Sequence, residues 1–217
     1  KTIQNSDLIH FKTLEKTTEI DPFFDKASLL KKIQGISLNF DLDVTKAAEA
    51  EIVIDRISGS SLKGNGTGNL LVEIDTKGKF EMFGDFLIEN GIYNFAYGGL
   101  INKPFEVRKG GVISWDGDPF GADLNLEAIH RVKANPKILL DNLNTNRKIP
   151  IDLVTKVEGK LFNSTEEFNI VIPNSSSLVA SELDFKLNEN DDNTKMRQFF
   201  SLLISKSFFN ENNLEAN

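Results

Sequence analysis

Histidines and carboxylates are the residues of this sequence that could do acid–base chemistry, and they form no recognisable catalytic pattern. Only His10 and His130 are present, and neither stands beside a nucleophile or at a metal-ligand spacing, so both are predicted to be structural or surface residues. Four aspartates could supply the paired carboxylates of a glycosidase: Asp75, Asp116, Asp118 and Asp123. The run Asp-Gly-Asp-Pro at 116–119 is, however, typical of turns. The sequence favours a protein that is not an enzyme, and a carbohydrate-acting enzyme is the weakest alternative.

Two further segments suggest ligand chemistry at first sight. The run Gly64-Asn65-Gly66-Thr67-Gly68 resembles a phosphate-binding loop, but such a loop needs a following helix, and the alternating residues from Leu70 to Ile74 predict a strand instead. We therefore expect a bulged or closely approached strand here. The acidic run at 188–193 lacks the ordered spacing of a calcium loop and is predicted to be a solvated connection. With no cysteine in the chain, no metal or cofactor is expected.

Composition excludes some partners and suggests others. The chain has 217 residues, of which 40% are hydrophobic and 26% charged, which is typical of a globular protein. The net charge is −7 and the basic residues are scattered, so nucleic acid is not an expected partner. There are 17 Phe against 2 Tyr and 1 Trp. This bias suits a wide water-free surface, although ordinary core packing explains it equally well.

Apolar residues recur with a period of two along most of the chain. Ile36, Leu38, Phe40, Leu42 and Val44 alternate with polar residues, which places them on one face of a strand. The spacing predicts about a dozen such strands. The further ones carry their apolar residues at 52–54, 70–74, 80–88, 93–97, 105–107, 113–115, 124–128, 149–153, 157–161, 168–172 and 183–187.

Three regions follow from these patterns. Residues 1–35 are predicted to be a linker or a short helical segment, residues 36–187 the sheet, and residues 188–217 an acidic loop, a short amphipathic helix and a disordered tail. Such a one-faced sheet must hide its apolar face. Either it folds over into a sandwich or barrel, or it curls into a half-pipe whose lining is covered by something other than protein.

The order of several motifs resembles the C-terminal domain of the TamB family. The resemblance covers residues 36 to 209, and the helical segment from Gln198 to Phe208 matches the family's end. The clearest motifs are Gly66-Thr67-Gly68-Asn69-Leu70, Gly78-Lys79-Phe80-Glu81-Met82, Glu89-Asn90-Gly91-Ile92-Tyr93-Asn94-Phe95, Asn102-Lys103-Pro104-Phe105 and Gly117-Asp118-Pro119. The resemblance implies an all-β fold called a β-taco, which is an elongated, curled sheet with a hydrophobic groove.

The resemblance also implies a function. The full protein would be anchored in the inner membrane of a Gram-negative cell, and this part would lie in the periplasm and carry phospholipid toward the outer membrane. An Omp85-family protein such as TamA would bind regions near or beyond the C-terminus, and membrane contact would be made by parts outside this chain. The alternative is a scaffold for outer-membrane protein assembly. The residues expected to bind lipid are Leu70, Val72, Ile74, Phe80, Met82, Phe86, Ile88, Tyr93, Phe95, Tyr97, Ile113, Trp115, Leu124, Leu126, Ile151, Leu153, Phe168 and Ile170.

Overall fold

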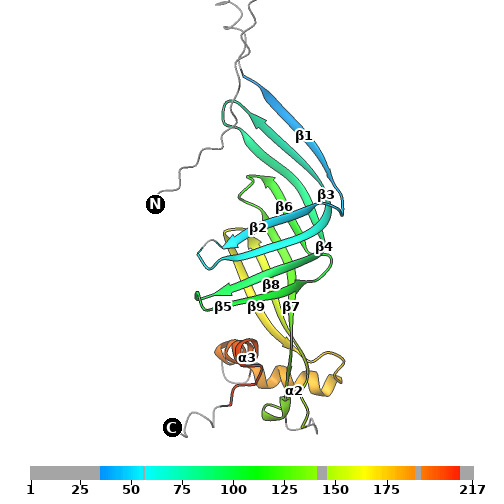
Figure 1. Ribbon diagram of the computed structural model, residues 1–217, viewed down its shortest axis with the longest axis vertical. Helices are drawn as coiled ribbons and strands as arrows, with labels where there is room; N and C mark the ends of the chain where they lie inside the picture. Colours follow the sequence, from blue (N-terminus) through cyan, green and yellow to red (C-terminus); the bar gives the residue numbers. More distant parts are fainter. Residues whose placement is uncertain (1–34, 56, 141–145, 189–191, 211–217) are drawn as a thin grey trace, which may run out of the picture. The chain divides into compact units, whose positions relative to one another are not determined.

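The computed structural model describes residues 35–55, 57–140, 146–188 and 192–210, and the chain divides into two units, Lys1–Ile36 and Ser37–Asn217. The predicted segment at 1–35 lies outside the described residues, apart from Gly35. In the second unit, nine strands of the described residues form one antiparallel sheet (Figure 1). They are β1 (Ser37–Val44), β2 (Glu49–Asp55), β3 (Ser60–Asp75), β4 (Phe80–Tyr97), β5 (Ile101–Val107), β6 (Val112–Gly117), β7 (Asp123–Ala134), β8 (Ile149–Lys160) and β9 (Asn163–Val171).

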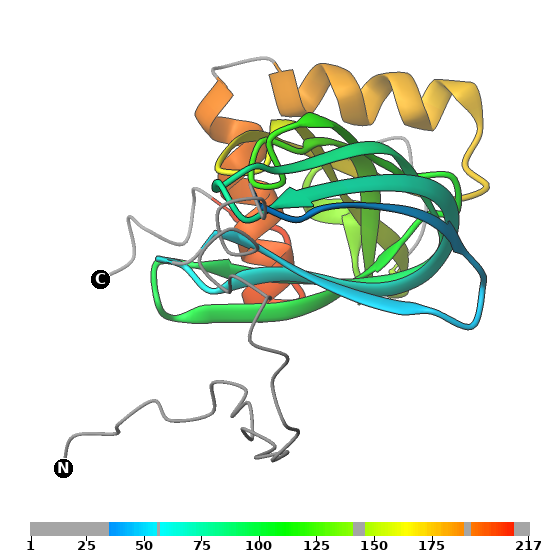
Figure 2. The same ribbon diagram turned by 90° about the horizontal axis from the view of Figure 1, so that it is seen from above.

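The sheet is built around two long strands that each change partner along their length. The main order is β1-β3-β4-β5-β7-β8-β9, while β2 pairs with β3 and β6 pairs with both β4 and β7. The first half of β4 pairs with β6 and its second half with β5. Likewise, β3 pairs first with β2 and then with β1. Because β3 and β4 bend between these two sets of partners, the sheet curls (Figures 1 and 2).

Glycines permit the close approach of β3 and β4 at the bend. A Cβ atom added to Gly68 would lie 2.1 Å from the carbonyl oxygen of Asp85, a distance that no side chain tolerates. The register shifts between Asn65 and Gly66, where Glu89 is the extra residue of a β-bulge. The glycine run at 64–68 is therefore part of a bulged and closely approached strand, as predicted.

At the C-terminal end of this unit, the apolar face of the sheet is buried in the hydrophobic core. Helix α3 (Asp192–Ser205) packs there against β7, β8 and β9. Its residues Phe199, Leu202 and Leu203 are buried, so the predicted amphipathic helix is confirmed. Helix α2 (Ser177–Asn188) and a single 3-10 turn, η1 (Pro136–Ile138), complete the described elements. In the described residues, no helix is long and apolar enough to cross a bilayer.

The prediction of a strand at 183–187 is wrong, because these residues lie in α2. The alternation of Leu183, Phe185 and Leu187 suggested a strand, but Phe185 is 62% exposed while Leu183 and Leu187, spaced by four, are buried. The Ser176 hydroxyl accepts a hydrogen bond from the Val179 backbone N–H and so caps the helix. The count of a dozen strands was also too high, since 80–88 and 93–97 belong to β4 and most of 149–161 belongs to β8.

Candidate functional site

The inner face of the curled sheet gathers the residues that the sequence predicted to line a groove. Residues directly opposite each other in an antiparallel sheet share a face. Leu42 lies opposite Leu70, Leu70 opposite Gly84, and Gly84 opposite Trp115. The lining residues of β4 change from even numbers up to Ile88 to odd numbers from Tyr93, because the bulge at Glu89 shifts the alternation by one residue. The predicted lining residues therefore lie on one face.

One end of this face is open, and we call it the open groove. On β1, the side chains of Leu38, Phe40 and Leu42 are 48%, 43% and 43% exposed. Ile74, which lies opposite Leu38, is 38% exposed, and Phe80, which lies opposite Ile74 on β4, is 49% exposed. Sequence reasoning left the β1 residues out of the lining, although their period of two was visible. Such a contiguous exposed apolar face is typical of interaction surfaces.

The other end of the inner face is closed by protein. Tyr93, Phe95 and Leu153 are fully buried, and two adjacent aromatic residues of α3 pack at this end, with the Phe200 ring 6.2 Å from the Phe95 ring between centroids. Phe199 lies 4.7 Å from Phe168 between ring centroids, and Phe200 lies 4.9 Å from Tyr97.

The predicted lipid-binding residues thus fall into two sets. Those with accessible side chains are Val72, Ile74, Phe80, Met82, Tyr97, Trp115 and Phe168. Those that are buried are Leu70, Phe86, Ile88, Tyr93, Phe95, Ile113, Leu124, Leu126, Ile151, Leu153 and Ile170.

A polar pair of the fully buried Tyr93 and the half-buried Glu166 crosses the inner face, and no sequence pattern predicted it. The Tyr93 hydroxyl of β4 donates a hydrogen bond to Glu166 Oε1 of β9, although β5, β7 and β8 separate these strands in the sheet. Burial raises the pKa of the Tyr93 phenol, and the bond to Glu166 adds to this. Burial also raises the pKa of the Glu166 carboxyl, against the opposing effect of the bond from Tyr93. The pair links the two sides of the curled sheet.

A hollow opens beside this pair, and we call it the hairpin hollow. It has a volume of about 640 Å³ and lies between the β2–β3 and β8–β9 hairpins and the end of β4. Glu166 and Phe168 of β9 line it on one side, and Ser60 and Tyr97 on another. The hairpin hollow is therefore continuous with the inner face of the sheet.

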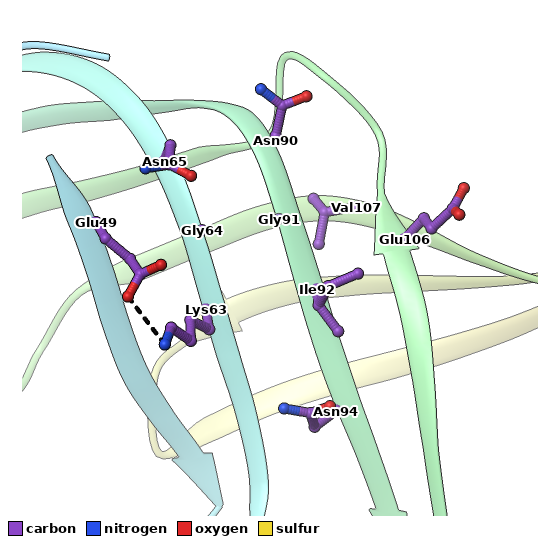
Figure 3. A pocket seen from close by; sticks show the side chains of 10 residues that line it. All are labelled: Glu49, Lys63, Gly64, Asn65, Asn90, Gly91, Ile92, Asn94, Glu106 and Val107. Carbon is purple, nitrogen blue, oxygen red and sulfur yellow. Dashed lines mark ion pairs between the residues drawn. The ribbon is translucent and has the colours of Figure 1, made fainter. Parts of the chain in front are cut away.

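A second hollow, of about 670 Å³, is lined on the outer face by Lys63, Ile92 and Asn94, beside the paired glycines Gly64 and Gly91 (Figure 3). Lys63 Nζ pairs there with Glu49 Oε1 at 2.9 Å. Both side chains are about half exposed, so this ion pair contributes little. The labelled lining residues in Figure 3 include no nucleophile beside a base, and we assign no chemistry to this hollow.

The residues singled out for acid–base chemistry have structural partners. His130 Nδ1 lies 2.8 Å from the carbonyl oxygen of Pro104, which fits the predicted structural role, while His10 lies outside the described residues. Asp75 accepts hydrogen bonds from the N–H groups of Lys77 and Lys79 in a turn, and Asp123 pairs with Lys160. In the described ranges, no three potential metal ligands lie close enough together to hold an ion.

The fold and site define a class of protein: a curled antiparallel sheet with one apolar face, open at one end and closed by a helix at the other. The comparison with family models places the chain within this class. Residues 2–217 match the model described as the TamB C-terminal domain, and the chain belongs to that family. A comparison with curated proteins gives no match.

Proposed function

We propose that this chain is the periplasmic part of a TamB-like protein that carries phospholipid acyl chains along its groove between the inner and outer membranes. It would do so without chemistry of its own, in a full protein anchored to the inner membrane. The observation that carries the proposal is the open groove, where Leu38 and Phe40 of β1 and Phe80 of β4 present accessible apolar surface on either side of β3.

The energetics of the groove suit a carrier. Each methylene withdrawn from water contributes about 0.8 kcal/mol, so an acyl chain gains several kcal/mol from lying on these strands. Movement along the groove depends only on differences between neighbouring positions. Since Leu38, Phe40 and Leu42 are similar side chains with similar exposure, those differences are small. Direction must then come from outside the groove.

The closed end sets a condition on this transport. Because α3 packs its aromatic residues onto Phe168 and Tyr97, we propose that lipid binds between β1 and the first half of β4 and passes beyond only when α3 is displaced. The residues buried under α3 would then bind lipid only in that second state.

Mass spectrometry of the chain purified without detergent tests the proposal. We expect co-purified phospholipid, which is lost when the accessible Phe80 is changed to Asp. The matched control is Leu87→Asp, because Leu87 lies on the same strand with 40% exposure but on the outer face. A chain without bound lipid, or equal losses in both variants, would count against a lipid groove.

A second function is supported by the free edges of the sheet. Within the described residues, β1 pairs only with β3 and β9 only with β8, and an unpaired edge can accept a further strand. The chain could therefore hold nascent outer-membrane strands, together with an Omp85-family partner. Proline substitutions along β9 should then abolish cross-links to a client while Phe80→Asp does little. The opposite outcome would reject the scaffold.

A further inference from the structure

Large apolar side chains stand exposed at the turns of four hairpins, and we call them the hairpin tips. Ile57 in the β2–β3 turn is 99% exposed and Leu100 in the β4–β5 turn is 95% exposed. Tyr97 at the end of β4 is 51% exposed. Phe120 in the β6–β7 turn and Phe162 in the β8–β9 turn are 58% and 51% exposed.

The hairpin tips belong to one region. Ile57, Tyr97 and Phe162 all line the hairpin hollow. The ring of Phe120 stacks on that of Phe162 with centroids 6.4 Å apart, and the Leu100 N–H donates to the carbonyl oxygen of Tyr97 in the same turn. Exposed apolar residues that occur singly need no explanation, but a group around one hollow indicates an interaction site.

The turns do not need these side chains for their geometry. The carboxylate of Asp55 accepts the N–H groups of Ile57 and Ser58, and Gly98 and Gly99 supply the positive φ angles of the β4–β5 turn. Asp118 likewise accepts the N–H of Phe120. Polar side chains could replace Ile57 and Leu100 without loss of a turn contact, so the apolar character of these two residues serves something outside the fold.

Charge selects the kind of partner. The residues from 55 to 60, 97 to 101, 117 to 123 and 160 to 163, which include the four turns, hold Asp55, Asp118 and Asp123 against Arg56 and Lys160. The turns therefore carry no net positive charge that would attract anionic headgroups. Single apolar side chains that protrude from separate turns fit between lipid molecules, whereas a folded partner needs a contiguous complementary surface. We infer that the hairpin tips insert into the surface of a zwitterionic lipid layer.

Docking of the hairpin tips would bring the lipid layer to the closed end of the inner face. Phe168 lines the hairpin hollow and also packs on Phe95 of the inner face, with ring centroids 5.7 Å apart. The hollow therefore joins the inner face to the surface that carries the hairpin tips. A role as the place where lipid enters or leaves rests on the proposed function, but the docking itself does not. The family resemblance implied membrane contact only through other parts of the full protein, and this inference adds a contact made by the chain itself.

Flotation with phosphatidylcholine vesicles tests the docking. We expect the chain to float with the vesicles, and the double variant Ile57→Ser with Leu100→Ser to bind at least tenfold more weakly, because burial of one such side chain is worth about tenfold or more in affinity. The matched control is Leu178→Ser, since Leu178 is 66% exposed on α2, away from the tips. Equal binding of the double variant and the control would overturn the inference.

Single cysteines then distinguish insertion from adsorption. The chain has no cysteine, so an environment-sensitive dye can be placed uniquely at Ile57→Cys, Phe162→Cys or Leu178→Cys. We expect a blue shift on vesicles at 57 and 162 but not at 178, and we expect it to persist in high salt. A requirement for phosphatidylglycerol, or release by salt, would overturn insertion in favour of electrostatic adsorption.

The outcomes separate docking from lipid carriage. If the Ile57→Ser, Leu100→Ser chain still co-purifies with lipid but no longer floats, docking is supported independently of the groove. If the chain floats but never holds lipid, the proposed function fails and the docking stands.

Discussion

A carboxylate at Phe40 in the open groove should abolish lipid binding while leaving the fold intact. Phe40 lies at the centre of β1, opposite Val72, and its side chain is 43% exposed. A Phe side chain has a surface of roughly 200 Å², so an acyl chain that covers the exposed part removes about 85 Å² from water. At about 25 cal/mol per Å², this contact is worth about 2 kcal/mol.

Loss of that contact corresponds to at least about 30-fold in affinity, and the Phe40→Asp charge adds a desolvation cost beside the lipid. The fold should be little affected, because the side chain is half exposed on an edge strand. We expect a change of less than about 1 kcal/mol in unfolding free energy, or a fall in melting temperature of less than about 4 °C.

A fluorescent lipid titration, combined with thermal unfolding followed by circular dichroism, measures both effects. Asn39→Asp is the matched control, because Asn39 precedes Phe40 on β1, faces the opposite side and is exposed. Binding that falls equally in both variants would indicate that charge on β1, and not the apolar face, matters. Unchanged binding in Phe40→Asp would refute the assignment of the groove.

Three further outcomes follow from the structure. Phe95 is fully buried, so Phe95→Asp should cost at least about 3 kcal/mol and abolish cooperative unfolding by circular dichroism; a normal melt would mean that Phe95 is accessible. A methyl group on Gly68 would clash with Asp85, so Gly68→Ala should lower the free energy of unfolding by about 1 to 3 kcal/mol in urea, and an unchanged midpoint would contradict the close approach. Burial raises the pKa of the Glu166 carboxyl above its ordinary value of 4.5. Between 4.5 and the raised pKa, the folded chain keeps a proton that the unfolded chain has lost. The free energy of unfolding of the native chain therefore falls as pH rises through this range. The melting temperature of Glu166→Gln relative to the native chain should therefore rise over that range, and a constant difference would mean that Glu166 titrates normally.

The strands were predictable from sequence because their period of two is strong. The apolar inner face imposed the alternation both where it is exposed, at Leu38, Phe40 and Leu42, and where it is buried, at Tyr93 and Phe95. The glycine run was correctly identified as a bulged strand. The strand prediction at 183–187 failed because a four-residue helical spacing contained a local alternation. A window that included Val179 and the Ser176 cap would have favoured the helix.

The site was less predictable than the strands. An alternation with a period of two shows which face of the sheet a residue lies on. It does not show whether that part of the face is open or covered, because this depends on where α3 packs. Phe86 and Phe95 were therefore predicted to line the groove although they are buried. The pair of Tyr93 and Glu166 joins strands 73 residues apart in sequence, and no local pattern reports such a contact. The hairpin tips other than Tyr97 were also missed, because isolated apolar residues in turns carry no periodic signal.

Photo-cross-linking from two positions of β4 tests the central claim most directly. A photoreactive phenylalanine analogue at Phe80 faces the open groove, whereas the same analogue at Leu87 faces outward at similar exposure, 40% against 49%. After irradiation in cells, we expect phospholipid adducts on the chain carrying the analogue at position 80 and none at position 87. Equal adducts at the two positions, or adducts only at 87, would contradict a lipid-carrying inner face.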